Sequence, residues 1–259
     1  MSGFLFHDVI FGPVRSRRLG LSLGINLLPL HKKLCSFNCI YCECGWTPAF
    51  VPSASEFPDR TQVARFLEQK LKQLVAEEYL PDSLTYAGNG EPTLHPEFSG
   101  IVDDTIELRN KYAPDTKVTV LSNSSMIHHP KVFAALNKLD NNILKLDAGS
   151  EKMLSLINQP VTPLVFKKLI SGLKMFNGNL IIQSMFLKGT VDGQIIDNTT
   201  QEEVLQWLNL LTEIKPKMVM VYPVARETPV HSIEKISDEV LQEIAERVRA
   251  AGLNVSVYH

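Results

Sequence analysis

All four cysteines of the 259-residue chain lie in one short stretch, between Cys35 and Cys44. A disulfide framework spreads its cysteines along the chain, because stabilisation arises from closing long loops. Clustered thiols indicate metal ligands or a redox site instead. Cys35, Cys39 and Cys42 are spaced four and three residues apart, and Cys44 is an extra thiol without an assigned role.

This spacing leaves three chemistries open. Three thiolates can bind an iron–sulfur cube and leave one iron without a protein ligand, and an open coordination position is typical of catalytic metal sites. A structural zinc site would use all four thiols, although such sites usually combine two cysteine pairs across a longer loop. A redox pair would need only Cys39 and Cys42. The spacing favours the iron–sulfur cluster.

With Tyr41 before its last cysteine, the loop reads C-x-x-x-C-x-aromatic-C. It resembles the signature of the radical S-adenosylmethionine (SAM) superfamily. The resemblance implies that Cys35, Cys39 and Cys42 hold a [4Fe–4S] cluster, whose open iron is chelated by SAM. It also implies that the reduced cluster cleaves SAM to a 5′-deoxyadenosyl radical, that Tyr41 packs near the adenine, and that the fold is a parallel α/β barrel.

A glycine-rich segment, Gly88-Asn89-Gly90-Glu91, follows the next predicted strand. Glycines let the main chain come close to a ligand, and the same residues are common in a turn between a strand and a helix. The resemblance implies that this segment contacts the amino group of SAM. Asn89 stands where the family has a glycine.

Polar residues at or near the ends of later strands complete the candidate site. In α/β barrels the carboxyl ends of the strands carry the site. By resemblance, Ser122 and Asn123 are candidates for the SAM carboxylate or ribose, and a simple turn is the alternative. Gln183 and Arg226 are further candidate cofactor-binding residues. Gln183 shares one face of its predicted strand with Met185, and an arginine suits an anionic group of SAM or substrate, with an exposed loop arginine as the alternative.

Lys145 and Asp147 are two residues apart in one predicted strand, so they share a face. Inside a barrel this face points to the cavity. The pair is the candidate catalytic pair, for substrate binding or proton transfer. A buried ion pair is the structural alternative.

Before the cysteines, Arg15, Arg17 and Arg18 lie among glycines. They predict a phosphate-sized anion site or a lid over the cluster, or else a solvated basic turn. The segment from Phe11 to about Thr47 resembles the radical SAM subgroup related to tRNA wybutosine-synthesising enzymes. Those enzymes carry further cysteines for a second cluster, which this chain lacks, so their reaction is not expected here and Lys145 is not predicted to form a Schiff base.

Short β-rich runs alternate with amphipathic stretches along the rest of the chain. The predicted strands are Leu23–Leu27, Leu84–Ala87, Lys117–Ser122, Ile143–Asp147, Leu180–Leu187, Met218–Pro223 and Asn254–Tyr258. The predicted helices are Asp59–Glu78, Pro96–Lys111, Pro130–Leu139, Pro163–Phe176, Thr200–Ile214 and Ser237–Ala251, and residues 47–58 are predicted to form a surface loop.

Repeated βα units imply parallel strands with right-handed crossovers. We therefore expect an α/β fold, a partial (β/α)6-type parallel barrel of the radical SAM type. It forms one domain over residues 1–259, with an N-terminal extension and lead-in strand in residues 1–30 and the cluster loop at 34–46. The formal charge of −2 excludes a strongly basic nucleic-acid coat. The chain lacks a secretory signal and an apolar run of about 18 residues, so a cytoplasmic protein without a membrane partner is expected.

The predicted function is that of a radical SAM enzyme that abstracts hydrogen from a tRNA nucleoside or a small metabolite. By the same resemblance, an electron donor such as flavodoxin or ferredoxin is an expected partner. The alternatives are a structural zinc protein, an iron–sulfur electron carrier, and an activase of a glycyl radical partner.

Overall fold

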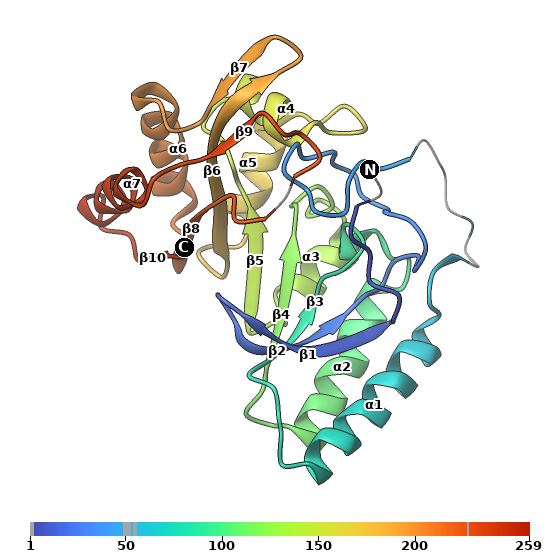
Figure 1. Cartoon of the computed structure of the whole chain (residues 1–259). Helices are drawn as coiled ribbons and strands as arrows, with labels where there is room; N and C mark the ends of the chain where they lie inside the picture. Colours follow the sequence, from blue (N-terminus) through green and yellow to red (C-terminus); the bar gives the residue numbers. More distant parts are fainter. Residues whose placement is uncertain (1–2, 49–52, 54–55, 227) are drawn as a thin grey trace.

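The computed structural model describes residues 3–48, 53, 56–226 and 228–259. Its strands (Figure 1) are β1 (Ile10–Ser16), β2 (Gly20–Ile25), β3 (Ser83–Tyr86), β4 (Lys117–Ser122), β5 (Asn141–Lys145), β6 (Ile181–Val191), β7 (Gln194–Asp197), β8 (Met218–Pro223), β9 (Ile233–Lys235) and β10 (Val255–Val257). Its helices are α1 (Arg60–Ala76), the short 3-10 helix η2 (Pro92–Leu94), α2 (Phe98–Tyr112), α3 (Pro130–Leu136), α4 (Glu151–Asn158), α5 (Phe166–Lys174), α6 (Gln201–Ile214) and α7 (Asp238–Ala250). No helix in these ranges is long and apolar enough to cross a membrane.

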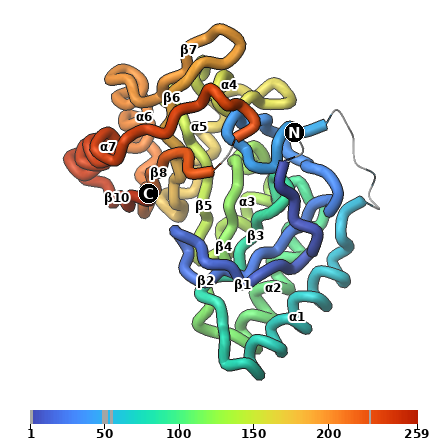
Figure 2. The backbone as a smooth tube through the Cα atoms, viewed as in Figure 1, coloured from blue at the N-terminus to red at the C-terminus, as the bar shows by residue number. Residues whose placement is uncertain are grey.

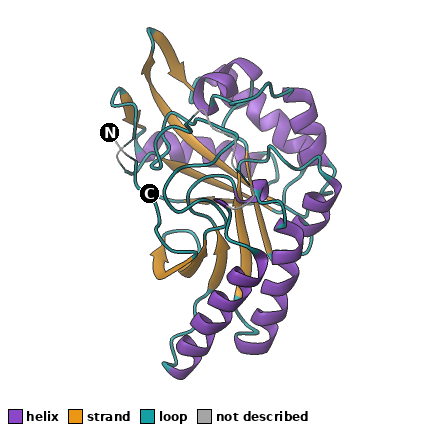
Figure 3. Cartoon of the chain, turned by 90° about the vertical axis from the view of Figure 1, so that its right-hand side faces the viewer, coloured by secondary structure: helices purple, strands orange, loops and turns teal. Residues whose placement is uncertain are grey.

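One curved sheet organises the chain, with the strand order β1-β2-β3-β4-β5-β6-β8-β10. Neighbouring strands from β2 to β10 are parallel, β1 is antiparallel to β2, and β7 and β9 pair with the long end of β6. The helices gather along the outer side of the sheet (Figure 3). The path ends at β1 and β10, which lie at opposite edges (Figure 2). The expected open α/β barrel is confirmed.

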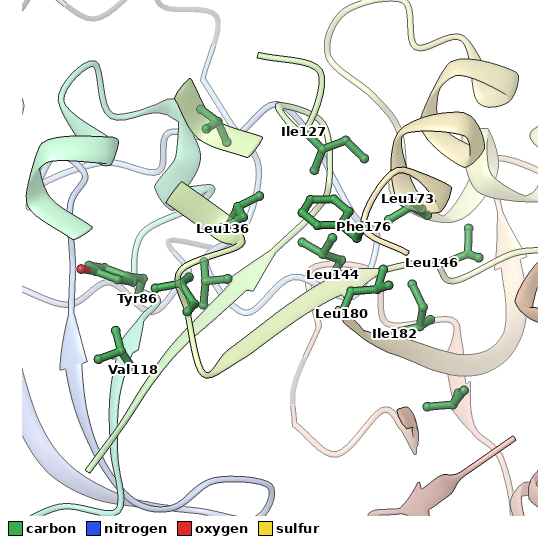
Figure 4. Close-up of a cluster of buried hydrophobic side chains, with 14 of the residues drawn as sticks. Tyr86, Val118, Ile127, Leu136, Leu144, Leu146, Leu173, Phe176, Leu180 and Ile182 are labelled. Atoms are coloured by element: carbon green, nitrogen blue, oxygen red, sulfur yellow. The ribbon is translucent and has the colours of Figure 1, made fainter. Parts of the chain in front are cut away.

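The main core fills the space between the sheet and its helices (Figure 4). Successive residues of a strand point to opposite faces, so Val118 and Val120 of β4 join this core while Thr119 between them faces the barrel interior. From the helices, Leu136 and Leu173 pack against the same layer with no exposed surface. Burying each such side chain contributes about 1.5–3 kcal/mol.

The inner face of β2, β3 and β4 is polar at its base. The hydroxyl oxygens of Ser22 and Thr85 lie 2.8 Å apart, and the hydroxyl of Ser83 donates to Thr119 Oγ1 at 2.8 Å. Because these hydroxyls satisfy one another, they can be buried at little cost. These three strands are therefore apolar mainly on their helix side.

All seven predicted strands form, and five further elements were not predicted. They are β1, η2, α4, β7 and β9, which lie in segments expected to be connections. Ser150 caps α4 by accepting from Met153 N at 3.1 Å, but the eight-residue helix is too short for a clear periodic pattern. The helix expected from Pro163 begins at Phe166. The surface loop predicted for residues 47–58 lies partly outside the described residues.

Candidate active site

The cysteine loop lies between β2 and α1 and is held from two sides. On one side, Leu34 N donates to Asn89 O at 2.8 Å and Glu91 N donates back to Leu34 O at 3.1 Å. On the other side, Ile40 N donates to Ile157 O of α4 at 3.0 Å. The loop is thus bound through its main chain both to the glycine-rich segment after β3 and to α4.

A cavity of about 360 Å³ lies at this end of the barrel and gathers most of the predicted residues. Twelve of them line it: Cys35, Cys39, Tyr41, Cys42, Gly88, Gly90, Glu91, Ser122, Asn123, Lys145, Gln183 and Arg226. The remaining two, Asn89 and Asp147, are not among the lining residues. A second hollow of about 590 Å³ shares Phe4, Cys42, Glu43 and Arg226 with the first.

The thiols lie in contrasting environments. Burial raises the pKa of Cys35 to about 12, so a bound metal group is needed to keep this thiol ionised at neutral pH. A hydrogen bond with Cys44 lowers the pKa of Cys42, and the nearby charge of Lys33 lowers it further. The ammonium of Lys33 is buried and donates to Gly45 O at 2.7 Å.

No three His, Cys, Asp or Glu side chains of the described residues are arranged to hold a single metal ion. A [4Fe–4S] cluster makes a different demand, because each cysteine binds a separate iron. Three thiols around one cavity, with a fourth not required, fit this donor set.

The two glycines after β3 are required by close contacts of the main chain. Gly88 and Gly90 have φ angles of 142° and 141°, which other residues rarely adopt. A Cβ atom at Gly90 would lie 1.8 Å from Leu34 O, and one at Gly88 would lie 2.6 Å from Oδ1 of Asn26. Gly90 therefore lets the segment pack directly against the start of the cysteine loop, and Gly88 lets it pack against the side chain of Asn26 after β2.

Asn89 turns its side chain toward the N-terminal segment. Its Oδ1 accepts from Phe6 N at 2.8 Å, and its Nδ2 donates to Phe6 O and Pro29 O, each at 2.9 Å. The residue is fully buried. It fixes Phe6 at the cavity wall, while the flanking glycines line the cavity itself.

Glu91 joins the ends of β3 and β4. Its carboxylate accepts from Ser122 Oγ at 2.9 Å, from Asn123 N at 2.6 Å and from Thr93 N at 3.1 Å. Burial raises the pKa of Glu91, and these donors oppose the rise. Asn123 in turn directs its Nδ2 to Cys35 Sγ at 3.5 Å, which links the carboxylate to the cysteine loop.

The predicted pair Lys145 and Asp147 forms a buried ion pair, with 3.5 Å between Nζ and Oδ2. Lys145 also donates to the hydroxyl of Tyr41 at 2.7 Å, and that hydroxyl donates to Asp147. Asn158 of α4, which the sequence analysis did not single out, donates to Asp147 Oδ2 at 2.7 Å and lies 3.3 Å from Cys39 Sγ. The ion pair is thus connected to the cysteine loop.

The two remaining candidates have protein partners. Arg226 forms an exposed ion pair with Glu43 at 2.6 Å, across the mouth shared by the two hollows. Gln183 accepts from Arg18 Nη1 at 2.7 Å inside the barrel. Arg17 also lines the cavity and donates to the main-chain oxygen of His259.

Phe4, Phe6 and Glu43 line the cavity but were not predicted. The two aromatic residues carry no periodic or motif signal, and their positions depend on distant contacts, of Phe6 with Asn89 and of Phe4 N with Glu43 O. Asn158 was missed because α4 itself was missed. Glu43 directly follows Cys42 in the sequence, and this position could have indicated that it lies at the cavity.

A comparison with family models identifies the superfamily of the chain. Residues 30–240 match the model of the radical SAM superfamily. The chain belongs to this superfamily. Radical SAM proteins use a [4Fe–4S] cluster and SAM, which are therefore the cofactors of this chain. The resemblance inferred from the cysteine loop is confirmed.

Two relatives are longer than the segment that matches this chain. The GTPase Obg of Brachyspira hyodysenteriae is 30% identical over 243 residues, which cover 90% of this chain and 32% of that protein. A UPF0026 protein of Methanocaldococcus jannaschii is 32% identical over 212 residues, covering 80% of this chain and 61% of that protein. The chain thus spans about a third to three fifths of these relatives.

Two solved structures share the radical SAM fold at low sequence identity. A radical SAM methyltransferase from Sphaerobacter thermophilus has a TM-score of 0.65 and 13% identity, covering 91% of this chain and 65% of that chain. TYW1 with a lysine–pyruvate adduct has a TM-score of 0.58 and 12% identity, covering 88% and 73%. At these identities the likeness shows the fold.

Proposed function

We propose that this radical SAM enzyme binds one [4Fe–4S] cluster through Cys35, Cys39 and Cys42, cleaves SAM reductively, and uses the 5′-deoxyadenosyl radical to take hydrogen from a substrate. One observation carries the proposal. The three thiols line the same cavity as the glycine-rich segment after β3 and the polar end of β4. Cysteines, glycines and polar groups that lie far apart in sequence therefore face one ligand-sized space.

When bound, the cluster supplies the electron that breaks a carbon–sulfur bond of SAM. The chain positions and encloses the reactants. Gly88 and Gly90 offer main-chain groups to the amino end of SAM, and Glu91 holds their segment against Asn123. Tyr41, Lys145 and Asp147 form a hydrogen-bonded wall whose buried charges are already paired. Such a wall keeps its geometry while reactants enter.

The substrate class and the electron donor belong to the same proposal. A tRNA nucleoside is supported by the sequence resemblance to wybutosine-synthesising enzymes, and a small metabolite is supported by the size of the cavity. An electron donor such as flavodoxin or ferredoxin would reduce the cluster. RNA binding would weaken steeply with rising salt, because phosphate contacts release counterions. RNA affinity that does not change with salt would exclude the tRNA substrate.

The decisive experiment is anaerobic reconstitution with iron and sulfide, followed by SAM and dithionite. We expect a brown protein with iron and sulfide in equal amounts, and formation of 5′-deoxyadenosine. The Cys39→Ala variant should lose both the colour and the product. Cys44→Ala is the matched control, since Cys44 lines the same cavity but is not a proposed ligand, and it should keep the cluster.

Other outcomes identify the alternatives. About one zinc without sulfide would indicate the structural zinc site, by the chemistry of four-thiol zinc ligation. A cluster that yields no 5′-deoxyadenosine would indicate an electron carrier. Transfer of the radical to a glycine of a partner protein would indicate an activase.

A further inference from the structure

Arg18 extends from the turn between β1 and β2 into the interior of the barrel. Its Nη1 donates to Gln183 Oε1 of β6 at 2.7 Å. Its guanidinium carbon lies 4.6 Å from the ring centre of Tyr222 in β8. The side chain is therefore held by neutral partners from two strands. Arg18, Gln183 and Tyr222 all line the 360 Å³ cavity that contains the cysteines.

Of the three other cations that line this cavity, two have carboxylate partners, and the third, Arg17, donates to the main-chain oxygen of His259. Lys145 is paired with Asp147, and Arg226 is paired with Glu43. Arg18 forms no ion pair with an Asp or Glu among residues 3–48, 53, 56–226 and 228–259. The cavity therefore contains a half-buried positive charge without a counter-charge from these residues.

This arrangement is suited to an oxyanion. A guanidinium has five N–H donors in a planar fork that matches carboxylate and phosphate groups, and the observed bond to Gln183 uses one of them. Stacking on Tyr222 fixes the plane of the fork before a ligand arrives. Removing a charge from water without compensation is costly, so an anion entering the cavity would offset that cost.

The location separates this site from the groups proposed to contact SAM. Gly88, Gly90 and Asn123 follow β3 and β4, whereas Gln183 and Tyr222 belong to β6 and β8. In the sheet, β5 lies between these two pairs of strands. The unpaired guanidinium thus faces the cavity from the wall opposite the glycine-rich segment.

We propose that Arg18 binds an anionic group, a carboxylate or a phosphate, of the enzyme's substrate. The inference rests on the proposed function and names the substrate class. The substrate carries an oxyanion group that is held at β6 and β8, and the rest of it extends from there toward SAM. It moves the predicted anion contact from Arg226, which is paired, to Arg18. It also gives a role to one of the three arginines before the cysteines.

The test uses isothermal titration calorimetry of the reconstituted holoenzyme with SAM present. Sodium phosphate and sodium acetate are titrated separately at constant ionic strength. We expect saturable binding of at least one anion to the wild type. Phosphate binding alone indicates a phosphate-bearing substrate, acetate binding alone indicates a carboxylate, and binding of both supports an oxyanion site that accepts either group.

Two variants and a control make the result specific. Arg18→Gln should weaken anion binding at least about tenfold, because a charge-assisted contact is lost. Gln183→Glu should have a similar effect with Arg18 still present, since it places a carboxylate next to the guanidinium, and it serves where Arg18→Gln does not fold. Arg15→Gln is the matched control, because Arg15 lines a separate surface hollow, and it should bind like the wild type.

The inference is overturned if neither anion binds the wild type, or if both variants bind anions as tightly as the wild type. It is also overturned if phosphate competes with SAM, because the anion would then occupy the site of SAM itself. Formation of 5′-deoxyadenosine by the wild type is measured in parallel. Its absence overturns the proposed function, whereas its presence without anion binding overturns only the role of Arg18.

Discussion

Replacing Asp147 by asparagine removes one charge from the buried ion pair beneath the cysteine loop while keeping the size of the side chain. The carboxylate is completely buried. It accepts hydrogen bonds from Tyr41 Oη, from Asn158 Nδ2 at 2.7 Å and from Met185 N at 2.9 Å. The ammonium of Lys145 lies 3.5 Å away as its ion-pair partner. All four groups are donors, so they require an acceptor at this position.

An asparagine cannot satisfy this arrangement. If its oxygen accepts from Met185 N, its NH2 group faces the NH2 of Asn158, and the opposite orientation places NH2 against Met185 N. Breaking a buried pair by removing one partner costs about 3–5 kcal/mol. For a chain of this size each kcal/mol lowers Tm by about 2–4 °C, so we expect Asp147→Asn to lower Tm by about 10 °C.

The pH dependence of the loss has a definite sign. Burial acts to lower the pKa of Lys145, but Asp147, Tyr222 and Cys39 together more than offset burial, with Asp147 as the largest of the three, and the pKa ends above its ordinary value. In the wild type this contribution to stability is present below pH about 10.4 and is lost above it. In the variant the largest of these compensating groups is lost, so burial lowers the pKa of Lys145 relative to the wild type. The Tm deficit of the variant should therefore shrink as pH rises from 7 toward 9.5.

The assay is thermal unfolding by circular dichroism under anaerobic conditions, for Asp147→Asn, Lys145→Met and the double variant. Because Lys145→Met removes the unpaired cation, the double variant should be more stable than the sum of the two single losses allows. A Tm within about 2 °C of the wild type for Asp147→Asn would refute the reasoning. Strictly additive losses would refute the coupling between the two charges.

Three further outcomes are expected. Burial lowers the pKa of His95, so the free energy of unfolding should fall as pH drops below about 6.5, the unfolded value; an NMR titration midpoint at or above 6.5 would contradict this. Asn89→Ala leaves the buried Pro29 O unpaired, at a cost of about 1–3 kcal/mol, and frees the partly buried main-chain groups of Phe6, so Tm should fall and proteolysis near Phe6 should accelerate. Arg226→Ala removes only an exposed ion pair with Glu43 worth less than about 1 kcal/mol, and its thermal unfolding curve should nearly overlay that of the wild type.

The sequence determined the chemistry because that information is local. The spacing of Cys35, Cys39 and Cys42 needs no knowledge of the rest of the chain, and it led to the family that the comparison confirmed. The strands were also predictable, because buried parallel strands are runs of apolar and β-branched residues. The glycines after β3 were recognised as well, although the reason for them belongs to the fold: a side chain would collide with the main chain of Leu34 at Gly90 and with Asn26 at Gly88.

Only the tertiary structure decided which distant groups share the cavity. Asn158 reaches Cys39 and Asp147 through a helix too short to give a periodic signal. Arg18 and Arg226 are both arginines next to site motifs, and sequence favoured the second. The fold pairs Arg226 with Glu43 and directs Arg18 to Gln183. Residue type and spacing determine which ligand a group is able to bind, whereas contacts between separate strands determine whether its charge is still free to do so.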